Sequence, residues 1–237
     1  MELAFHVAQN GLHAAGFRQG LIANNLANLT TDGYKAELAD QATLRGQGTR
    51  IDNTASDLSV GSPRQTGIPQ HMYIAGEGFF QVQIDGETGY TRLGNFHLDQ
   101  DGNLVTPAGY LLEPNISVPE DSQGFGVSPD GIVYSIAPDG TSAELGQIQL
   151  ARFVNPNGLE SIGDNLYIRT TNSGDAQLET PGQAGVGLLH QSMLESSNVD
   201  PSTEITQQLI NQRYTQLNLR VFQTADALVS RALDMFG

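Results

Sequence analysis

The first apolar pattern of the chain lies between Leu3 and Asn28, where apolar residues recur three and four positions apart. This spacing puts them on one face, so it predicts an amphipathic helix with a coiled-coil type of seam. Glycines within it each cost up to about 1 kcal/mol relative to alanine but let a partner helix approach closely. The alternative is a helix packed on the core of its own domain. The seam, with one polar interruption, comprises Phe5, Ala8, Leu12, Ala15, Gln19, Ile22, Leu26 and Leu29.

A second helical pattern runs from Ser202 to Met235, after a helix start signal formed by Asp200 and Pro201. Its residues form two adjacent stripes, which make an apolar face too broad for a single partner helix. We therefore expect homo-oligomeric packing of this helix. The first stripe comprises Ile210, Tyr214, Leu217, Val221, Thr224, Leu228, Arg231 and Met235. The second comprises Asn218, Phe222, Ala225, Val229, Ala232 and Phe236.

The segment between the helices divides into two parts. Residues 36–70 are rich in Gly, Thr, Ser, Arg and Asp without a sustained hydrophobic period, which predicts an extended arm or linker. From Met72 to about Leu194, short apolar runs alternate with turn sequences such as Asp101-Gly102-Asn103. This alternation predicts a small all-β domain, sandwich- or barrel-like.

The expected fold class is therefore α+β. Amphipathic, coiled-coil-like N- and C-terminal helices pack together, and the central all-β domain is looped out between them. The predicted divisions are an N-terminal helix and turn at 1–35, the arm at 36–70, the β domain at 71–194 and the C-terminal helix at 195–237.

The composition narrows the classes of function. With 26 acidic and 11 basic residues the formal charge is −15, so binding to nucleic acid or to an anionic membrane is not expected. The chain has no Cys, which excludes disulfides, thiolate zinc sites and a Cys nucleophile. No apolar run approaches the roughly 20 residues of a membrane span, so direct membrane insertion is not expected. The first residues already have a helical pattern, and a cleaved secretory leader is not expected.

Chemistry-bearing patterns are weak. The five His residues do not show the helical spacing of a metal site, and no Gly-x-Ser-x-Gly nucleophile elbow or phosphate loop occurs. Residues 99–103 carry side-chain oxygens at alternating positions, as a calcium loop does, but their flanks have strand patterns and favour a β-turn. We therefore predict no catalytic site, no metal and no cofactor, and we do not expect an enzyme.

The turn after the first helix is the most informative segment. Asn28, Thr30, Thr31 and Asp32 have side chains that compete with helical hydrogen bonds, and Gly33 adopts positive φ at little cost. The sequence therefore predicts that the helix stops here in an Asn-rich turn, with Gly33 in the left-handed conformation.

The same turn belongs to a longer motif. The segment Ala23-Asn24-Asn25-Leu26-Ala27-Asn28, followed by Thr31-x-Gly33-Tyr34-Lys35, closely resembles the N-terminal signature of the bacterial flagellar axial proteins. Other segments also resemble this family of rod, hook and hook-associated subunits, and together they extend over nearly the whole chain. They are residues 65–82, Tyr90-Thr91-Arg92-x-Gly94-x-Phe96 with residues 101–109, residues 159–167, Glu195-Ser196-Ser197-Asn198-Val199-Asp200, and residues 212–226.

The resemblance implies a structural subunit of the basal-body rod that self-assembles into a helical tube and transmits torque from motor to hook. Its implied partners are copies of itself, other rod and hook proteins, the surrounding basal-body ring proteins and the flagellar type III export apparatus. The implied location is the rod, which crosses the periplasm, after export without a cleaved signal peptide. Residues 159–167 most resemble distal members of the rod group; proximal rod members and hook-like proteins are the alternatives.

The candidate site is an assembly interface on the two helices and the turn. A secreted β-domain adhesin or binding module with helical stalks is the alternative from another class, and it predicts activity without the termini. The candidate interface residues are Leu12, Ile22, Asn24, Asn25, Leu26, Asn28, Gly33, Ile210, Tyr214, Leu217, Val221, Phe222 and Leu228.

Overall fold

A computed structural model describes residues 2–44, 48–84 and 86–236, and the chain divides into two compact units. The helical unit comprises Met1–Leu29, Ala36–Asp57 and Val199–Gly237, and the β unit comprises Thr30–Lys35 and Leu58–Asn198. Helices at both ends with a β-rich centre confirm the α+β class.

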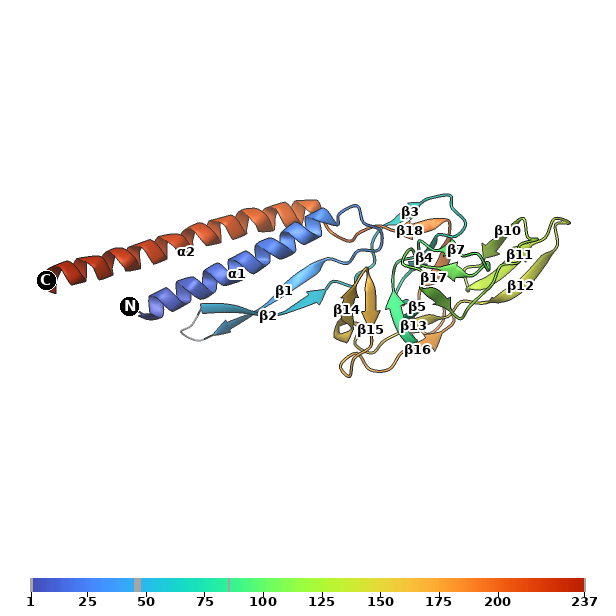
Figure 1. The fold of residues 1–237 in the computed structure, drawn as a ribbon, viewed down its shortest axis with the longest axis horizontal. Coiled ribbons are helices and arrows are strands. Elements are labelled where there is room, and N and C mark those ends of the chain that lie inside the picture. The colour runs from blue at the N-terminus through green and yellow to red at the C-terminus, as the bar shows by residue number, and fades with distance from the viewer. Residues whose placement is uncertain (1, 45–47, 85, 237) are drawn as a thin grey trace. The chain divides into compact units, whose positions relative to one another are not determined.

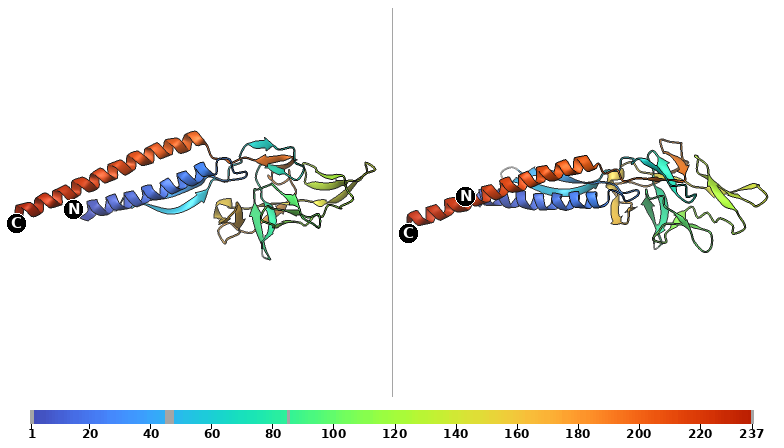
Figure 2. Two further views of the ribbon diagram at one scale, coloured as in Figure 1. Left: turned by 45° about the horizontal axis from the view of Figure 1, so that its top comes forward. Right: turned by 90° about the horizontal axis from the view of Figure 1, so that it is seen from above.

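The helical unit contains α1 (Glu2–Ala27) and α2 (Pro201–Phe236), which lie side by side in the views of Figures 1 and 2. The helices run antiparallel, because Asn25 near the end of α1 contacts Glu204 at the start of α2, and Gly11 lies against Asn218. Both helices were predicted to within two residues at each end.

The start of α2 has the predicted cap. The Asp200 carboxylate accepts hydrogen bonds from the backbone amides of Ser202 (3.1 Å) and Thr203 (3.2 Å) and from the Thr203 hydroxyl (2.6 Å). These bonds satisfy amides that the first turn of a helix leaves without a partner. They also lower the pKa of Asp200, the Thr203 hydroxyl contributing most.

Residues 36–70, expected to be an extended arm or linker, contain paired strands that the sequence did not predict. Strands β1 (Glu37–Leu44) and β2 (Gly48–Ser56) pair as an antiparallel hairpin, with Glu37 opposite Ser56, and they lie beside α1 (Figure 1). These strands are rich in Asp, Asn, Gln, Ala and Gly, residues of low strand propensity. Packing against α1 is a tertiary contact that strand propensity does not report.

The β unit consists of short strands, as its turn spacing predicted. Apart from the 3₁₀ turn η1 (Pro156–Gly158), its described residues contain no helix. Its strands are β3 (Pro63–Gln65), β4 (Met72–Ala75), β5 (Phe80–Ile84), β6 (Glu87–Thr91), β7 (His97–Leu98), β8 (Leu104–Val105), β9 (Leu111–Glu113), β10 (Gly124–Val127), β11 (Ile132–Ile136), β12 (Ser142–Gln147), β13 (Leu150–Arg152), β14 (Glu160–Gly163), β15 (Leu166–Ile168), β16 (Gln177–Glu179), β17 (Leu188–Gln191) and β18 (Met193–Glu195).

Antiparallel ladders join these strands into one large sheet and several small ones. Seven strands form the large sheet in the order β14-β15-β6-β5-β9-β8-β7. The strands β10, β11 and β12 form a three-stranded sheet, and β13 pairs with β16, β17 with β4, and β18 with β3. Segments far apart in sequence, such as β3 and β18, are therefore held together by backbone hydrogen bonds.

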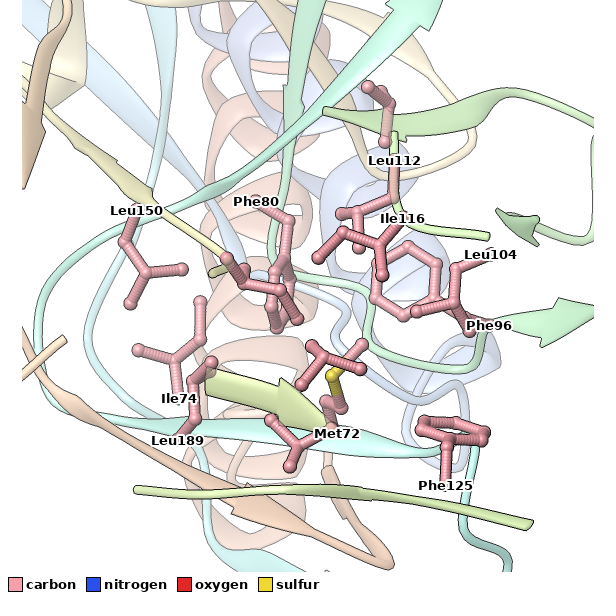
Figure 3. Close-up of a cluster of buried hydrophobic side chains, with 14 of the residues drawn as sticks. Met72, Ile74, Phe80, Phe96, Leu104, Leu112, Ile116, Phe125, Leu150 and Leu189 are labelled. Atoms are coloured by element: carbon pink, nitrogen blue, oxygen red, sulfur yellow. The ribbon is translucent and has the colours of Figure 1, made fainter. Parts of the chain in front are cut away.

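The core of the β unit is built from large apolar side chains (Figure 3). Phe80 is fully buried and meets Phe96 edge to face, with ring centroids 5.1 Å apart. A second cluster contains Phe79, Tyr90 and Phe153, and here too the rings meet edge to face. Burial of side chains of this size gives the unit a hydrophobic core of its own.

Candidate assembly interface

The contact between α1 and α2 follows residues three, four or seven positions apart. On α1, Gly11, Ala15 and Asn25 are buried and contact α2, and Ala8 and Ile22, which continue the same spacing, are also buried. On α2, Glu204, Asn211 and Ala225 are buried, and Asn218 between them is partly buried. We call this contact the helix seam. Of the seam positions predicted on α1, Ala8, Ala15 and Ile22 are buried and Leu12, Gln19, Leu26 and Leu29 are partly buried; the side chain of Phe5 lies outside the described residues.

The helix seam is mostly polar on the α2 side. The Asn211 side-chain amide donates to the Ala15 carbonyl at 2.9 Å. A Cβ added to Gly11 would lie 2.8 Å from the Asn218 side chain, so Gly11 is needed for this close approach. Small and polar contacts bury little apolar surface, so the seam specifies the pairing of the helices more than it stabilises it.

Asn25 joins three elements of the helical unit. Its side chain is 2% exposed, donates to Glu204 Oε1 (2.9 Å) and to the Glu37 carbonyl (3.0 Å), and accepts from the Glu37 amide (2.9 Å). It therefore holds α1, α2 and β1 within one chain. Asn28 is partly buried and donates to the Asn24 carbonyl at 3.0 Å, while Asn24 itself is exposed.

The first predicted stripe of α2 lies away from the helix seam. Five residues of the candidate interface on α2 are exposed: Ile210 (53%), Leu217 (58%), Val221 (45%), Phe222 (40%) and Leu228 (57%). We call Ile210, Leu217, Val221 and Leu228 the outer face. Phe222 lies four residues from Asn218 and three from Ala225, on the seam side of the helix. Leu217 is one residue from Asn218 of the seam, which rotates it by about 100° around a helix of 3.6 residues per turn. Tyr214 is partly buried, and the Arg18 guanidinium lies 5.2 Å from the centre of its ring.

The second predicted stripe is divided. Asn218 and Ala225 belong to the helix seam, Phe222 lies beside them and is exposed, and the side chains of Val229, Ala232 and Phe236 lie outside the described residues. Ile205, Leu209 and Leu219 are also exposed but were not predicted as interface residues. Glu204 and Asn211 were not predicted either; their signal is that Glu204, Asn211 and Asn218 follow one another at intervals of seven residues.

A groove of about 430 Å³ runs along the helix pair. Leu12, Ala15, Gly16 and Gln19 line it from α1, and Asn211, Gln212, Thr215 and Gln216 line it from α2. Nothing lies within 4 Å of a Cβ placed on Gly16. The helical unit therefore offers both a row of large apolar side chains and a recess.

The turn after α1 belongs to the β unit and has the predicted backbone. Gly33 has φ of 65°, and an added Cβ would lie 3.3 Å from Leu93 Cα. The Gly33 amide donates to the Glu195 carbonyl at 2.7 Å, and Asp32 accepts from Arg64 at 2.7 Å. The structure thus places Gly33 in contacts within its own chain.

Other chemistries find little support in the described part of the chain. Among those residues there is no cluster of three His, Asp or Glu side chains that could hold a metal ion. Asp99 Oδ1 accepts from the amides of Asp101 and Asn103 between β7 and β8, as expected of a turn, and these bonds with that of the Asn103 side chain lower its pKa. No described helix combines the length and the apolar character that crossing a membrane requires.

Comparison with protein families gives matches along the chain. The family described as flagella basal body rod protein matches residues 5–35. The flagellar hook protein FlgE/F/G D1 domain matches residues 73–135, and the flagellar basal body rod FlgEFG protein C-terminal family matches residues 190–235.

Individual relatives align over nearly the full length. The flagellar basal-body rod protein FlgG of Buchnera aphidicola subsp. Baizongia pistaciae (strain Bp) is 36% identical over 253 positions, covering 96% of this chain and 97% of the relative. FlgG of Caulobacter vibrioides is 35% identical and covers 95% of this chain and 96% of the relative. The rod protein FlgF of that bacterium is 33% identical over 233 positions and covers 92% of this chain and 91% of the relative.

Proposed function

The chain belongs to the family of flagellar basal-body rod proteins, and from this premise we propose that it builds the rod by packing the outer face of α2 against neighbouring copies of itself. It is a structural subunit of the basal-body rod, most like the FlgG proteins, with FlgF as the weaker alternative. Membership implies assembly with other rod and hook components of the flagellum.

The exposure of the outer face is the observation that carries the proposal. Leu217 and Leu228 are each more than half exposed, and neither contributes to the helix seam. Full burial of one such side chain is worth about 1.5–3 kcal/mol. A row of them on a protein surface is typical of an interaction site, since monomeric proteins rarely leave large apolar patches in water.

The interface we propose is heterologous, which means that different surfaces of two copies meet. The outer face of one copy contacts a different part of the next, and the groove between α1 and α2 offers a recess for its side chains. Contacts of this kind that do not close into a ring generate a helical polymer. The spacing of three and four residues along the helix seam supports a coiled-coil-like pairing of α1 and α2 within each subunit.

We further propose that the turn residues Asn28 and Gly33 act within the subunit, by ending α1 and fixing the chain that follows it. Position in the distal rod, passage across the periplasm, torque transmission, contact with the ring proteins and export through the flagellar type III apparatus stay predictions from the family resemblance. The division of the chain at residues 35, 70 and 194 also stays a prediction.

The test compares two Asp substitutions on α2. Leu217→Asp places a carboxylate in the proposed interface, where burial of an unpaired charge costs several kcal/mol and recurs in every subunit. Gln223→Asp adds the same charge to an exposed polar position of the same helix. Electron microscopy should show tubes from the unchanged protein and from Gln223→Asp, and none from Leu217→Asp.

Calorimetry of the monomers provides the second measurement. The unfolding transition of the β unit should be the same in both variants, because its core contains no part of α2. Normal tubes from Leu217→Asp would remove the outer face from the interface. Ligand binding by the β unit that persists when both helices are deleted would instead favour the adhesin alternative.

A further inference from the structure

Three of the motifs that carry the family resemblance each bring one charged side chain to the same place in the β unit. Lys35 comes from the turn motif, Arg92 from the Tyr-Thr-Arg motif and Glu195 from the motif that precedes α2. Their side chains are 0%, 3% and 2% exposed, respectively. Charged side chains are almost never buried to this extent unless they are paired.

Glu195 is the centre of this cluster. Its Oε1 accepts from Lys35 Nζ at 2.5 Å and from the Gly61 amide at 2.7 Å. Its Oε2 accepts from two nitrogens of Arg92, Nε at 3.0 Å and a terminal nitrogen at 2.9 Å. The Glu195 backbone carbonyl accepts from the Gly33 amide. Glu195 thus joins its own segment to three others that are distant in sequence.

The two cations also hold backbone carbonyls. Lys35 Nζ donates to the Ser59 carbonyl, and Arg92 donates to the carbonyls of Gly76 (2.8 Å) and Gly78 (2.7 Å). These bonds leave the cations well satisfied by neutral acceptors, but the cluster still contains two positive charges and one negative charge. Glu195 is therefore the member whose loss changes the electrostatic balance most, from one excess positive charge to two.

The residues of the cluster lie close to the points where the chain passes between the two units. The chain passes between the two units after Leu29, Lys35, Asp57 and Asn198. Lys35 is the last residue of the first segment of the β unit, Ser59 and Gly61 lie close to the start of the second, and Glu195 lies three residues before its end. Asn198 adds a bond to the Ser59 carbonyl at 3.2 Å. The ends of the β unit's segments therefore meet around one carboxylate.

We propose that Glu195 is a positioning residue that fixes the ends of these segments in one register, so that every subunit presents the same connections when it assembles. A cluster needed only for the stability of the β unit could be placed anywhere in its core. This one lies where the chain enters and leaves the unit. The local ordering stands on the geometry alone, whereas its effect on assembly rests on the proposed function.

The first test is hydrogen exchange in Glu195→Gln, which keeps the shape of the side chain and removes its charge. The amides of Gly33, Gly61 and Ser196 should exchange at least about tenfold faster, because two buried cations lose their counter-charge, while Val82 of β5 changes by less than about twofold. Glu77→Gln is the matched control, because the Glu77 side chain is 72% exposed and its ion pair with Arg152 is long, at 3.7 Å. This variant should change none of these exchange rates. An equal increase at Val82, or no increase at Gly33 and Gly61, would overturn the proposal.

A second variant keeps the proposal testable if Glu195→Gln does not fold. Lys35→Met leaves Arg92 and Glu195 as a neutral pair, so it should fold and accelerate exchange near Gly33 and Gly61 less than Glu195→Gln does. Combined with Glu195→Gln, it removes one of the two cations that have lost Glu195 and should restore part of the lost protection. Additive losses in the double variant would contradict the role of Glu195 as the charge that holds both cations.

Imaging of tubes separates this inference from the proposed function. Glu195→Gln should give fewer or irregular tubes even though its outer face is intact. Normal tubes despite faster local exchange would overturn the positioning role in assembly and leave the proposed interface standing. Normal tubes from Leu217→Asp would overturn the interface and leave the exchange result standing.

Discussion

In the β unit the largest apolar side chains are buried against one another. In the helical unit several large apolar side chains instead lie on the surface of α2. Phe80 and Phe96 are almost completely buried in the β unit. The helix seam instead buries Glu204, Asn211, Asn25 and mostly small apolar residues, of which Ile22 is the largest, while Leu217 is 58% exposed. The β unit therefore buries its large apolar side chains within the chain, whereas the helical unit leaves several of them exposed to water.

This difference shows what each unit can do alone. A buried apolar core gives the β unit stability of its own, since each buried aromatic side chain contributes several kcal/mol. The buried apolar side chains of the helices are mainly small, and most helical stability in proteins comes from packing of an apolar face. We therefore expect the helical unit to gain stability when its outer face is covered, so that assembly and ordering of the helices occur together.

The largest expected effect comes from truncating a matched pair of apolar residues. Phe80→Ala removes a fully buried ring and should destabilise the β unit by about 3–5 kcal/mol. Leu217→Ala removes an exposed side chain and should change the stability of the monomer by less than about 0.5 kcal/mol. Thermal unfolding of both monomers measures this, and comparable losses would mean that Leu217 belongs to a core within the chain.

A smaller effect is expected at the turn after α1. Gly33→Val forces a β-branched residue into positive φ and brings its Cβ to 3.3 Å from Leu93 Cα, which should cost about 1–3 kcal/mol. Asp32→Asn weakens a surface ion pair with Arg64, which is worth about 0–1 kcal/mol. Gly33→Val should therefore reduce motility and tube formation more than Asp32→Asn. The reverse order would show that the left-handed turn is unimportant.

Two glycines of α1 test how closely the helix seam is packed. Gly16→Ala meets nothing within 4 Å and should stabilise α1 by about 0.5–1 kcal/mol, since alanine favours helix. Gly11→Ala places a Cβ 2.8 Å from the partly buried Asn218 side chain, so it should lose this gain or destabilise the unit. Helicity of the two monomers, followed by circular dichroism during heating, makes the comparison. Equal gains would mean that the helices are not in close contact.

The smallest effect concerns the cap of α2. Hydrogen bonds from the Thr203 hydroxyl and the first amides lower the pKa of Asp200 from its ordinary value of 3.8, so the ionised carboxylate is favoured in the folded helix. Its contribution is present above that ordinary value and is lost as pH falls through the lower pKa of the folded state. Asp200→Ala should therefore reduce helicity at neutral pH. The difference in helicity between the variant and the unchanged protein should become smaller as the solution is acidified below about pH 4. A difference in helicity that does not change with pH would show that the charge of Asp200 does not contribute to the cap.

The sequence predicted those features that depend on neighbouring residues. The cap at Asp200 and Pro201, the ends of both helices and the positive φ of Gly33 follow from local conformational preferences that tertiary contacts here do not oppose. The strand that became β5 was recognisable because its apolar residues alternate with Gln81 and Gln83. Each of these signals lies within a few residues of the feature that it specifies.

Features that depend on distant contacts were not predicted. The hairpin of β1 and β2 has polar strands that are positioned beside α1, so its sequence resembled a linker. Asn211 occupies the helix seam because its amide reaches a carbonyl of α1, and hydrophobic periodicity gives polar residues no weight. The ion cluster around Glu195 joins residues up to 160 positions apart, as Lys35 and Glu195 are. Each motif was visible in the sequence, but their meeting point was not.

The most direct test of the proposed assembly interface makes use of the absence of Cys from the chain. Single Cys variants at Leu217 on the outer face and at Ala225 in the helix seam are labelled with a thiol reagent, first as monomers and then as tubes. We predict that Leu217→Cys reacts quickly in the monomer and at least about tenfold more slowly in tubes, because assembly through the proposed interface buries the outer face. Ala225→Cys should already react slowly in the monomer. Equal reactivity of Leu217→Cys in monomer and tube would contradict the proposal that this face is the assembly interface.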